Sequence, residues 1–496
     1  MALVFVCATC NGFRVTSGRM NGASFGKGVV ARVVLALVLV GALVVASFYG
    51  LSWYSSLCVR TASINFEGPI IWAATQLGAG QNIYPASAHT AQPWITILYP
   101  PLYMLLGALG SLFAGISYVP LRLVSALSTV VAAVFMYKTM RMQACSLAVS
   151  LAATAFYFSF GCVLYESAEC RPDMLSVAFG VLAMHALVAV LRKRGENSLT
   201  WRDMVAPAVL VTISCMAKQQ GVVYLLAMVL TLAAGRRIKA AACLGGIWLA
   251  GTSSLFFVTE VISGGFMANL TLLSSVRSRT DVLINNLASV GLDWFKVFFA
   301  LGLAPVGILL NKQPTADERL PLILFFLSSV ILSYSMGIPA SNVQHLLPAL
   351  LGLCWWLGLT LRKLPSFLCV VALAFVAVNV KPVYMEQMAY MQMEPRARQD
   401  IAKLQSLGLE GKFVLTDDVY INLLTKSKPV FVDCATFINS WKDTGKGFAE
   451  LNAKIAERQY AAIVISESDV RDGGDKKFRP QTVIRAIKKS YVQKDL

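Results

Sequence analysis

The chain has 496 residues, of which 57% are hydrophobic and only 14% are charged. Soluble globular proteins have roughly 45–50% apolar and about 25% charged residues, so this composition excludes a soluble enzyme, a disordered chain and a coiled coil. The formal net charge is +17. In a chain with many long apolar runs, this charge indicates basic cytoplasmic loops rather than a nucleic-acid-binding surface. We therefore expect a polytopic α-helical membrane protein with no nucleic-acid partner.

The first apolar run covers residues 29–54 and follows several basic residues. Positive charge before a span predicts a cytoplasmic N-terminus, so residues 1–28 are expected to form a cytoplasmic tail. The run lacks a convincing small-residue cleavage site, which favours a membrane anchor over a removed signal peptide. The chain should therefore leave the membrane on its external side near residue 55.

Ten further apolar runs predict the other spans, about eleven in all. They are Val119–Tyr137, Cys145–Tyr165, Met174–Leu191, Met204–Ala217, Gly221–Ala234, Ala240–Glu260, Ala288–Leu310, Leu320–Met336, His345–Leu361 and Pro365–Val380. Basic clusters recur in alternate loops, which orients the bundle and places the C-terminal part outside. The runs at 204–217 and 221–234 are shorter than the roughly 20 residues that a span needs, so we expect them to be tilted or broken. Residues 29–380 form the predicted membrane domain.

One large external loop, residues 55–118, separates the first two spans. Its apolar segment Tyr99–Ala114 begins with two prolines and is short for the roughly 30 Å of hydrocarbon. Counting it as a span would also place the basic residues Lys138 and Arg141 outside. We therefore expect an interfacial helix on the outer leaflet. Large ordered loops often have a functional role.

Past Lys381 the composition becomes that of a soluble domain. Residues 412–416, 430–432 and 461–466 are predicted strands, and residues 419–425 and 448–459 are predicted helices. This alternation predicts a small three-layer α/β domain over residues 381–496, outside the membrane. It has no glycine-rich phosphate loop, so a lid or docking surface is a more plausible role than catalysis.

Two acidic segments lie on the predicted external face. Glu67 follows the first span in the segment Asn65–Pro69, and it is either an ordinary solvated loop charge or a general base beside the bilayer. Asp173 opens a predicted span directly after Arg171 and Pro172. An acid at that depth requires a partner, for which Arg171 is the nearest candidate. This segment fits a paired structural turn and a substrate site equally well.

Several other polar residues interrupt apolar runs on the same face. Lys218 either extends to the interface or binds an anion. Arg277 lies in an external segment. This segment is either a solvated amphipathic loop or a site at which Arg277 attracts phosphate. The candidate substrate-binding residues are Tyr99, Gln219, Asn342 and His345. A lone histidine at a helix end is more often structural than a ligand. Their convergence on one face predicts a site for a substrate with an anionic head and a lipid tail.

Four segments together resemble the glycosyltransferase-C superfamily, whose polytopic enzymes use lipid-linked sugars. They are INFEGPIIWAATQLGAGQNIYP, YPPLYMLLGALGSLFAG, ESAECRPDMLS and CMAKQQG. In this order they are similar to the branch that contains bacterial aminoarabinose transferases and protein O-mannosyltransferases, and within it to the lipopolysaccharide-sugar transferases. The family's acidic loop usually reads Asp-Glu, whereas here Phe66 precedes Glu67. The missing aspartate also removes one ligand of a possible divalent metal.

The resemblance implies an inverting transfer from a polyprenyl-phosphate sugar to a hydroxyl of a glycan, lipid or protein. Glu67 would act as the base and Asp173 as its helper or substitute. Lys218, with Arg171 or Arg277, would bind the donor phosphate. No cofactor is implied as required, and a divalent metal is possible but not evident. The implied location is the inner (plasma) membrane, with membrane lipid as a partner.

A transporter or flippase of an anionic lipid-linked substrate is the main alternative, because intramembrane charges also mark transport paths. The absence of paired internal repeats argues against it. A purely structural assembly protein is the least favoured alternative. Cys162 and Cys170 flank the second acidic segment and are either disulfide-bonded or two free thiols.

Overall fold

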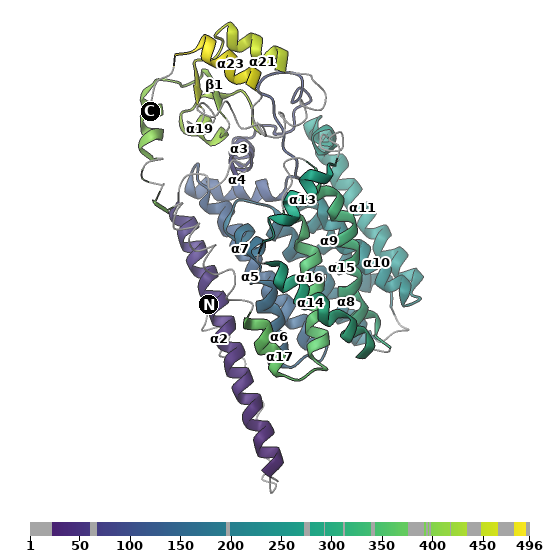
Figure 1. Ribbon diagram of the computed structural model, residues 1–496. Helices are drawn as coiled ribbons and strands as arrows, with labels where there is room; N and C mark the ends of the chain where they lie inside the picture. Colours follow the sequence, from purple (N-terminus) through teal and green to yellow (C-terminus); the bar gives the residue numbers. More distant parts are fainter. Residues whose placement is uncertain are drawn as a thin grey trace.

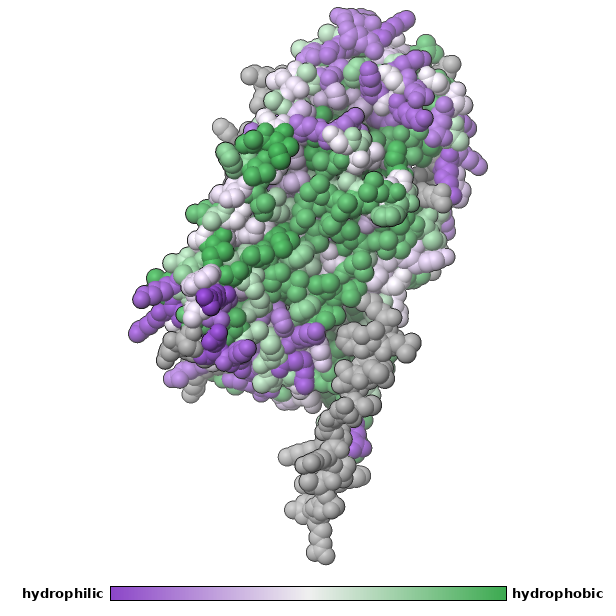
Figure 2. All heavy atoms as spheres, turned by 180° about the vertical axis from the view of Figure 1, so that it is seen from behind, coloured by the Kyte–Doolittle hydropathy of each residue, from purple (hydrophilic) through white to green (hydrophobic). Residues whose placement is uncertain are grey.

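The computed structural model describes residues 22–59, 67–194, 199–271, 278–291, 293–310, 313–338, 343–374, 391–392, 395, 398–416, 418–433, 448–464 and 481–492. A helical bundle makes up most of the molecule, and a small α/β unit lies at one end of it (Figure 1). Figure 2 shows a broad band of hydrophobic residues across the bundle, with hydrophilic residues gathered at both ends. This is the surface expected of a chain that spans a bilayer.

Seven helices in the described residues are long and apolar enough to cross a membrane. They are α2 (Gly22–Cys58), α5 (Val119–Met142), α8 (Asp173–Arg194), α11 (Ile238–Ser263), α14 (Asp293–Leu310), α15 (Ala316–Met336) and the consecutive pair η3 (Val343–Leu346) and α16 (Leu347–Leu361). The last of these is the most enclosed, with every residue of α16 buried among its neighbours. In contrast, most of the apolar part of α2 faces outward. Membrane helices can leave apolar side chains exposed because lipid replaces water around them.

Two further helices are together long and apolar enough for an eighth span, but the chain bends sharply between them. Helices α6 (Leu147–Tyr157) and α7 (Gly161–Ala168) meet at an angle of 72°. A break of this kind leaves backbone groups without their helical partners, and α14 supplies replacements. Lys296 donates from Nζ to the carbonyl of Ser159 at 2.5 Å and to Oδ1 of Asp293 at 2.9 Å, and Asp293 Oδ2 accepts the N–H of Gly161 at 2.7 Å. A buried ion pair therefore stabilises the bend.

Each of the eleven predicted runs coincides with a helix, although not all of these helices have the length of a span. The shorter ones are α9 (Trp201–Ala217), η1 (Gln219–Gly221) with α10 (Val222–Ala234), and α17 (Phe367–Ala374). The predicted run 288–310 begins as a transmembrane helix only at Asp293, and the end of the run 365–380 lies outside the described residues. The total of eleven crossings stays a prediction.

The external loop contains α3 (Glu67–Gly78) and α4 (Leu102–Ala114), which pack together and against the start of α5. Helix α4 begins directly after the two prolines and has 13 residues, too few for a span. It buries Tyr103 and Met104 but exposes Leu105, Leu109, Leu112 and Phe113, the last to 92%. One apolar face is therefore open to the surroundings, as expected of an interfacial helix.

The C-terminal unit is built on a parallel three-stranded sheet in the order β2-β1-β3. Its strands are β1 (Phe413–Thr416), β2 (Lys428–Pro429) and β3 (Ala462–Val464). Helices α21 (Phe448–Ala456) and α23 (Gln481–Ser490) lie on one side of the sheet and α19 (Val419–Leu424) on the other (Figure 1). The described residues of this unit thus combine a parallel sheet with helices, whereas an external α/β domain over residues 381–496 stays a prediction. The predicted strand at 430–432 is wrong, because β2 ends at Pro429 and Phe431 forms only an isolated bridge, with Trp94 of the external loop.

Candidate functional site

Polar side chains from five elements meet where the bundle borders the external loop and the C-terminal unit. They come from α3, α5, the turn between α7 and α8, the break between α9 and η1, and η3. Tertiary contacts bring these elements together, because α5 and α9 both pack against α8 and α7 contacts η3. The sequence analysis assigned most of these residues to one face, and the structure shows which of them pair.

Glu67 forms a buried ion pair with Arg122. The carboxylate accepts Nε of Arg122 at 3.0 Å and Nη2 at 2.7 Å, and its Oε1 also accepts the backbone N–H of Cys170 at 2.8 Å. The two side chains are 0% and 2% exposed. Glu67 also opens α3, where the helix dipole favours a negative charge.

The remaining donor of Arg122 holds the end of α2. Its Nη1 donates to the carbonyls of Ser56 at 2.5 Å and Val59 at 2.6 Å, which have no helical partner at this terminus. The guanidinium carbon lies 4.8 Å from the ring centroid of Tyr118. Arg122 therefore links α2, α3 and α5. Sequence analysis missed it, although a single arginine near the start of an apolar run signals a required buried partner.

Arg171 does not pair with Asp173, which corrects the sequence-based expectation. Its Nη1 lies 3.1 Å from Oε1 of Glu166, and its Nε lies 2.9 Å from Oε2 of Glu169. The turn is held further by Ser125, whose hydroxyl donates to the carbonyl of Arg171 at 3.1 Å. Burial raises the pKa of Glu169 to about 7, although the charge of Arg171 opposes this shift.

The partner of Asp173 is Lys218. Nζ of Lys218 lies 2.5 Å from Oδ1 of Asp173, and the side chains are 4% and 3% exposed. The other carboxylate oxygen, Oδ2, is buried and has no hydrogen-bond partner among the described residues. A buried, unbonded carboxylate oxygen costs free energy unless a ligand or water satisfies it, so this atom marks a candidate reactive position.

Local backbone structure places Lys218 at this position. It follows the last residue of α9 in an extended conformation (φ −152°, ψ 131°), so the helix stops and its side chain leaves the helical path. The chain then turns tightly at Gly221, where a Cβ would lie within 2.7 Å of Ser214 Oγ and of the Cys215 backbone nitrogen. The predicted break between the runs at 204–217 and 221–234 is therefore confirmed, and it carries a charged side chain into the cluster.

The candidate substrate-binding residues divide into two groups. Three lie at the cluster: the ring of Tyr99 is 5.5 Å from Nζ of Lys218, Gln219 donates to the carbonyl of Leu98 at 3.0 Å, and His345 bonds to Gln220. His345 is also 2.8 Å from the Ser335 hydroxyl. The other group, Asn342 and the predicted phosphate ligand Arg277, lies outside the described residues.

The described residues contain no group of three or more histidine, cysteine, aspartate or glutamate side chains arranged to hold a metal ion. Cys162 and Cys170 are both free thiols, which excludes the disulfide left open by the sequence analysis. The cluster therefore offers carboxylates, one lysine and two arginines as its chemical groups. Such a set can accept a proton and stabilise an anion.

The chain matches no protein-family model and no curated protein sequence. Among solved structures it is similar to ArnT from Cupriavidus metallidurans in the apo state, with a TM-score of 0.58 and 14% identity over 87% of this chain and 94% of that chain. It is also similar to ArnT from the same organism bound to undecaprenyl phosphate, with a TM-score of 0.56 and 13% identity over 85% of this chain and 90% of that chain. A third similar structure is the archaeal oligosaccharyltransferase AglB from Archaeoglobus fulgidus, in complex with an inhibitory peptide and a dolichol-phosphate. Its TM-score is 0.54, with 12% identity over 80% of this chain and 64% of that chain. The chain therefore shares the fold of these structures, in agreement with the fold that the sequence resemblance implied.

Proposed function

We propose that this protein is an integral-membrane glycosyltransferase that moves a sugar from a polyprenyl-phosphate donor to a hydroxyl of a cell-envelope glycan, glycolipid or protein. The fold supports this proposal, because the similar ArnT and AglB structures hold undecaprenyl phosphate and a dolichol-phosphate. The observation that carries it is the Asp173–Lys218 pair with the unbonded Oδ2 of Asp173. This pair places a proton acceptor beside a group that can bind phosphate.

In the proposed reaction, Asp173 is the general base. Its Oδ2 takes the proton of the acceptor hydroxyl while the acceptor oxygen bonds to the anomeric carbon of the sugar. The bond between that carbon and the phosphate oxygen breaks, and its electron pair stays on the phosphate. A single displacement of this kind inverts the configuration at the anomeric carbon.

The geometry favours Asp173 over Glu67 as the base. Both oxygens of Glu67 already accept hydrogen bonds, and the side chain is fully buried. A base must reach the proton that it abstracts, directly or through one water. The base role of Glu67 stays a prediction, and in this proposal Glu67 instead holds the turn that leads to Asp173.

Lys218 is the proposed phosphate ligand. Its Nζ contacts Oδ1 of Asp173, the carboxylate that carries the unbonded oxygen, and it lies beside Tyr99 on the external loop. A lysine is well suited to this role because its ammonium is a compact charge on a flexible stem. Arg171 is a second candidate from the sequence, but it already contacts two carboxylates. Arg277 stays a predicted ligand outside the described residues.

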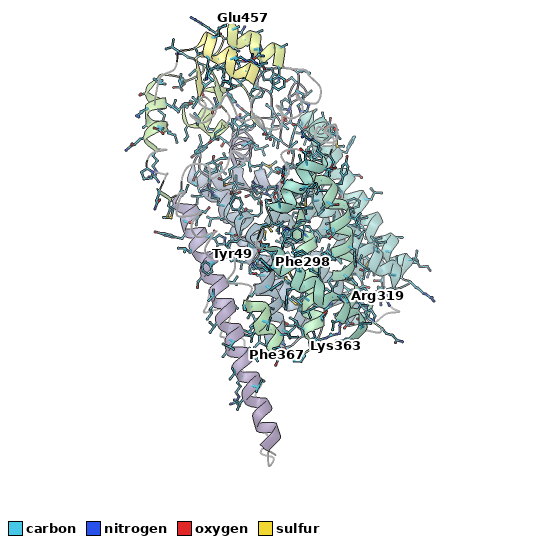
Figure 3. All side chains as sticks on the ribbon, in the orientation of Figure 1. Tyr49, Phe298, Arg319, Lys363, Phe367 and Glu457 are labelled. Atoms are coloured by element: carbon cyan, nitrogen blue, oxygen red, sulfur yellow. The ribbon has the colours of Figure 1, made fainter. Side chains whose placement is uncertain are left out.

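We place the site on the external side of the plasma membrane. Glu67 of the polar cluster opens α3, which packs against α19 of the C-terminal unit. This unit, which includes Glu457, lies at one end of the molecule (Figure 3). The basic residues Arg319 and Lys363 lie at the opposite end. Since basic residues favour the cytoplasmic side, this arrangement supports a cytoplasmic N-terminus and an external C-terminal unit.

The test uses the purified full-length protein in lipid nanodiscs. It is incubated with a panel of undecaprenyl-phosphate sugars and a membrane-lipid extract, and loss of the donor is followed by mass spectrometry. We expect the wild type to consume one donor and Asp173→Asn to consume none. Asp400→Asn, which removes an exposed carboxylate of the C-terminal unit, is the matched control and should remain active.

Two outcomes would contradict this proposal. If every donor binds but none is consumed, the protein is not a transferase for these lipids. If, in addition, proteoliposomes containing the protein move a labelled donor between leaflets, the flippase alternative is supported instead.

A further inference from the structure

Each cation of the described polar cluster already contacts a carboxylate. Arg122 contacts Glu67, Arg171 contacts Glu166 and Glu169, and Lys218 contacts Asp173. All of these side chains are at most 6% exposed. A phosphate that enters this cluster must therefore compete with a carboxylate for its cation.

Lys218 is the cation that can be exchanged with the least disruption. Arg122 donates from Nε and Nη2 to Glu67 and from Nη1 to two backbone carbonyls at the end of α2. Moving it would therefore break the link between α2 and α3. Arg171 is held by two carboxylates. Lys218 contacts one oxygen of one carboxylate, and its ammonium can turn on a flexible stem.

We propose that the donor phosphate displaces Asp173 from Lys218, so that binding of the donor releases the catalytic base. This inference rests on the proposed function and adds an order of events to it. Before the donor binds, Lys218 occupies Oδ1 of Asp173. Once the phosphate has taken the ammonium, both oxygens of Asp173 are available to the acceptor hydroxyl.

The exchange compensates the buried charge of Lys218 in both states. Without the donor, the ion pair compensates two buried charges, each of which would be costly alone. With the donor, the phosphate takes over the lysine, and the carboxylate is left without a cation. A buried carboxylate that loses its cation binds a proton more readily, which is the task of a general base.

The complex with undecaprenyl phosphate corresponds to the state after transfer. In that state the proton of the acceptor is on Asp173 and the leaving phosphate is on Lys218. Undecaprenyl phosphate alone, without any sugar or acceptor, is therefore the probe for the exchange. Its binding is measurable whether or not a transfer reaction has been found.

The first experiment measures the dissociation constant of undecaprenyl phosphate for the nanodisc-embedded wild type, for Asp173→Asn and for the control Asp400→Asn. If the two anions compete for Lys218, removing the carboxylate charge should tighten binding roughly tenfold or more, the effect of about one pKa unit of interaction. The control should bind like the wild type. Weaker or equal binding by a folded Asp173→Asn would overturn the exchange.

The second experiment needs no variant at the site and covers the case in which Asp173→Asn fails to fold. Calorimetric titration of the wild type with undecaprenyl phosphate at about pH 8, where the phosphate is already a dianion, is repeated in buffers of different ionisation enthalpy and reports protons taken up on binding. We expect net uptake, and no uptake would overturn the exchange. If the wild type does not bind undecaprenyl phosphate at all, the proposed function fails as well, which separates the two conclusions.

Discussion

Arg122 on α5 binds both carboxylate oxygens of Glu67 on α3, at 3.0 and 2.7 Å. Because Glu67 also accepts the N–H of Cys170, this pair fixes the turn before α8 and hence the position of Asp173. Glu67, which the sequence marked as a base, thus contacts the turn three residues before Asp173. In this arrangement Glu67 positions the turn, and Asp173 has the proposed chemical role.

Replacing one member of this pair should mainly destabilise the protein. Glu67→Gln leaves the guanidinium of Arg122 buried without a charged partner, which typically costs about 3–5 kcal/mol. We expect a lower melting temperature in detergent, and a smaller loss for the double variant Glu67→Gln/Arg122→Met than for the sum of the two single ones. Unchanged melting of Glu67→Gln together with lost turnover would instead identify Glu67 as the base.

The bend between α6 and α7 depends on the buried pair of Asp293 and Lys296. Lys296→Met removes the donor to Ser159 and leaves the Asp293 carboxylate without its cation, so it should also cost about 3–5 kcal/mol. Thermal unfolding in detergent measures this change. The double variant Asp293→Asn/Lys296→Met should recover part of the loss, and no recovery would show that the two side chains act separately.

The raised pKa of Glu169 predicts that the stability of the folded protein depends on pH. Burial raises its pKa from 4.5 to about 7 in the folded chain, so over this interval the folded protein binds more protons than the unfolded one. The contribution of Glu169 to stability is therefore greatest below pH 4.5, falls as the pH rises from about 4.5 to about 7, and is constant above that. Melting temperatures across this range should fall less steeply for Glu169→Gln than for the wild type, whereas the exposed control Glu450→Gln should follow the wild type. Parallel profiles for Glu169→Gln and the wild type would refute this assignment.

Trp94 joins the external loop to the C-terminal unit. Its backbone N–H donates to Val430 and its carbonyl accepts from Val432, both at 2.9 Å, while its ring packs on Phe431. Trp94→Ala removes a large buried side chain, at a cost of about 3–5 kcal/mol. We expect faster proteolysis between the bundle and the C-terminal unit.

Trp94→Ala also tests whether the C-terminal unit helps to position Tyr99 and Lys218 at the proposed site. Tyr99, beside Lys218, lies only five residues after Trp94, so a loosened loop should weaken the binding of undecaprenyl phosphate. The exposed Leu407→Ala in the C-terminal unit is a control that leaves this contact intact. Faster proteolysis with unchanged binding would limit Trp94 to a structural role.

The helical character of the chain and the positions of most helices could be predicted from the sequence alone. Apolar runs mark helices because the hydrocarbon thickness and the need to satisfy backbone groups act on each segment locally. The order of four short segments sufficed to predict the fold that the chain shares with the ArnT and AglB structures. The break at Lys218 was also predictable, since a lysine between two short apolar runs interrupts both.

The pairing of the buried charges could be seen only in the three-dimensional structure. The nearest basic residue in the sequence, Arg171, does not form an ion pair with Asp173; its side chain contacts Glu166 and Glu169 instead. The actual partner, Lys218, comes from a helix end 45 residues later in the chain. Pairing depends on which helix ends meet, and that is set by packing over the whole bundle, whereas hydrophobicity is a property of each segment alone.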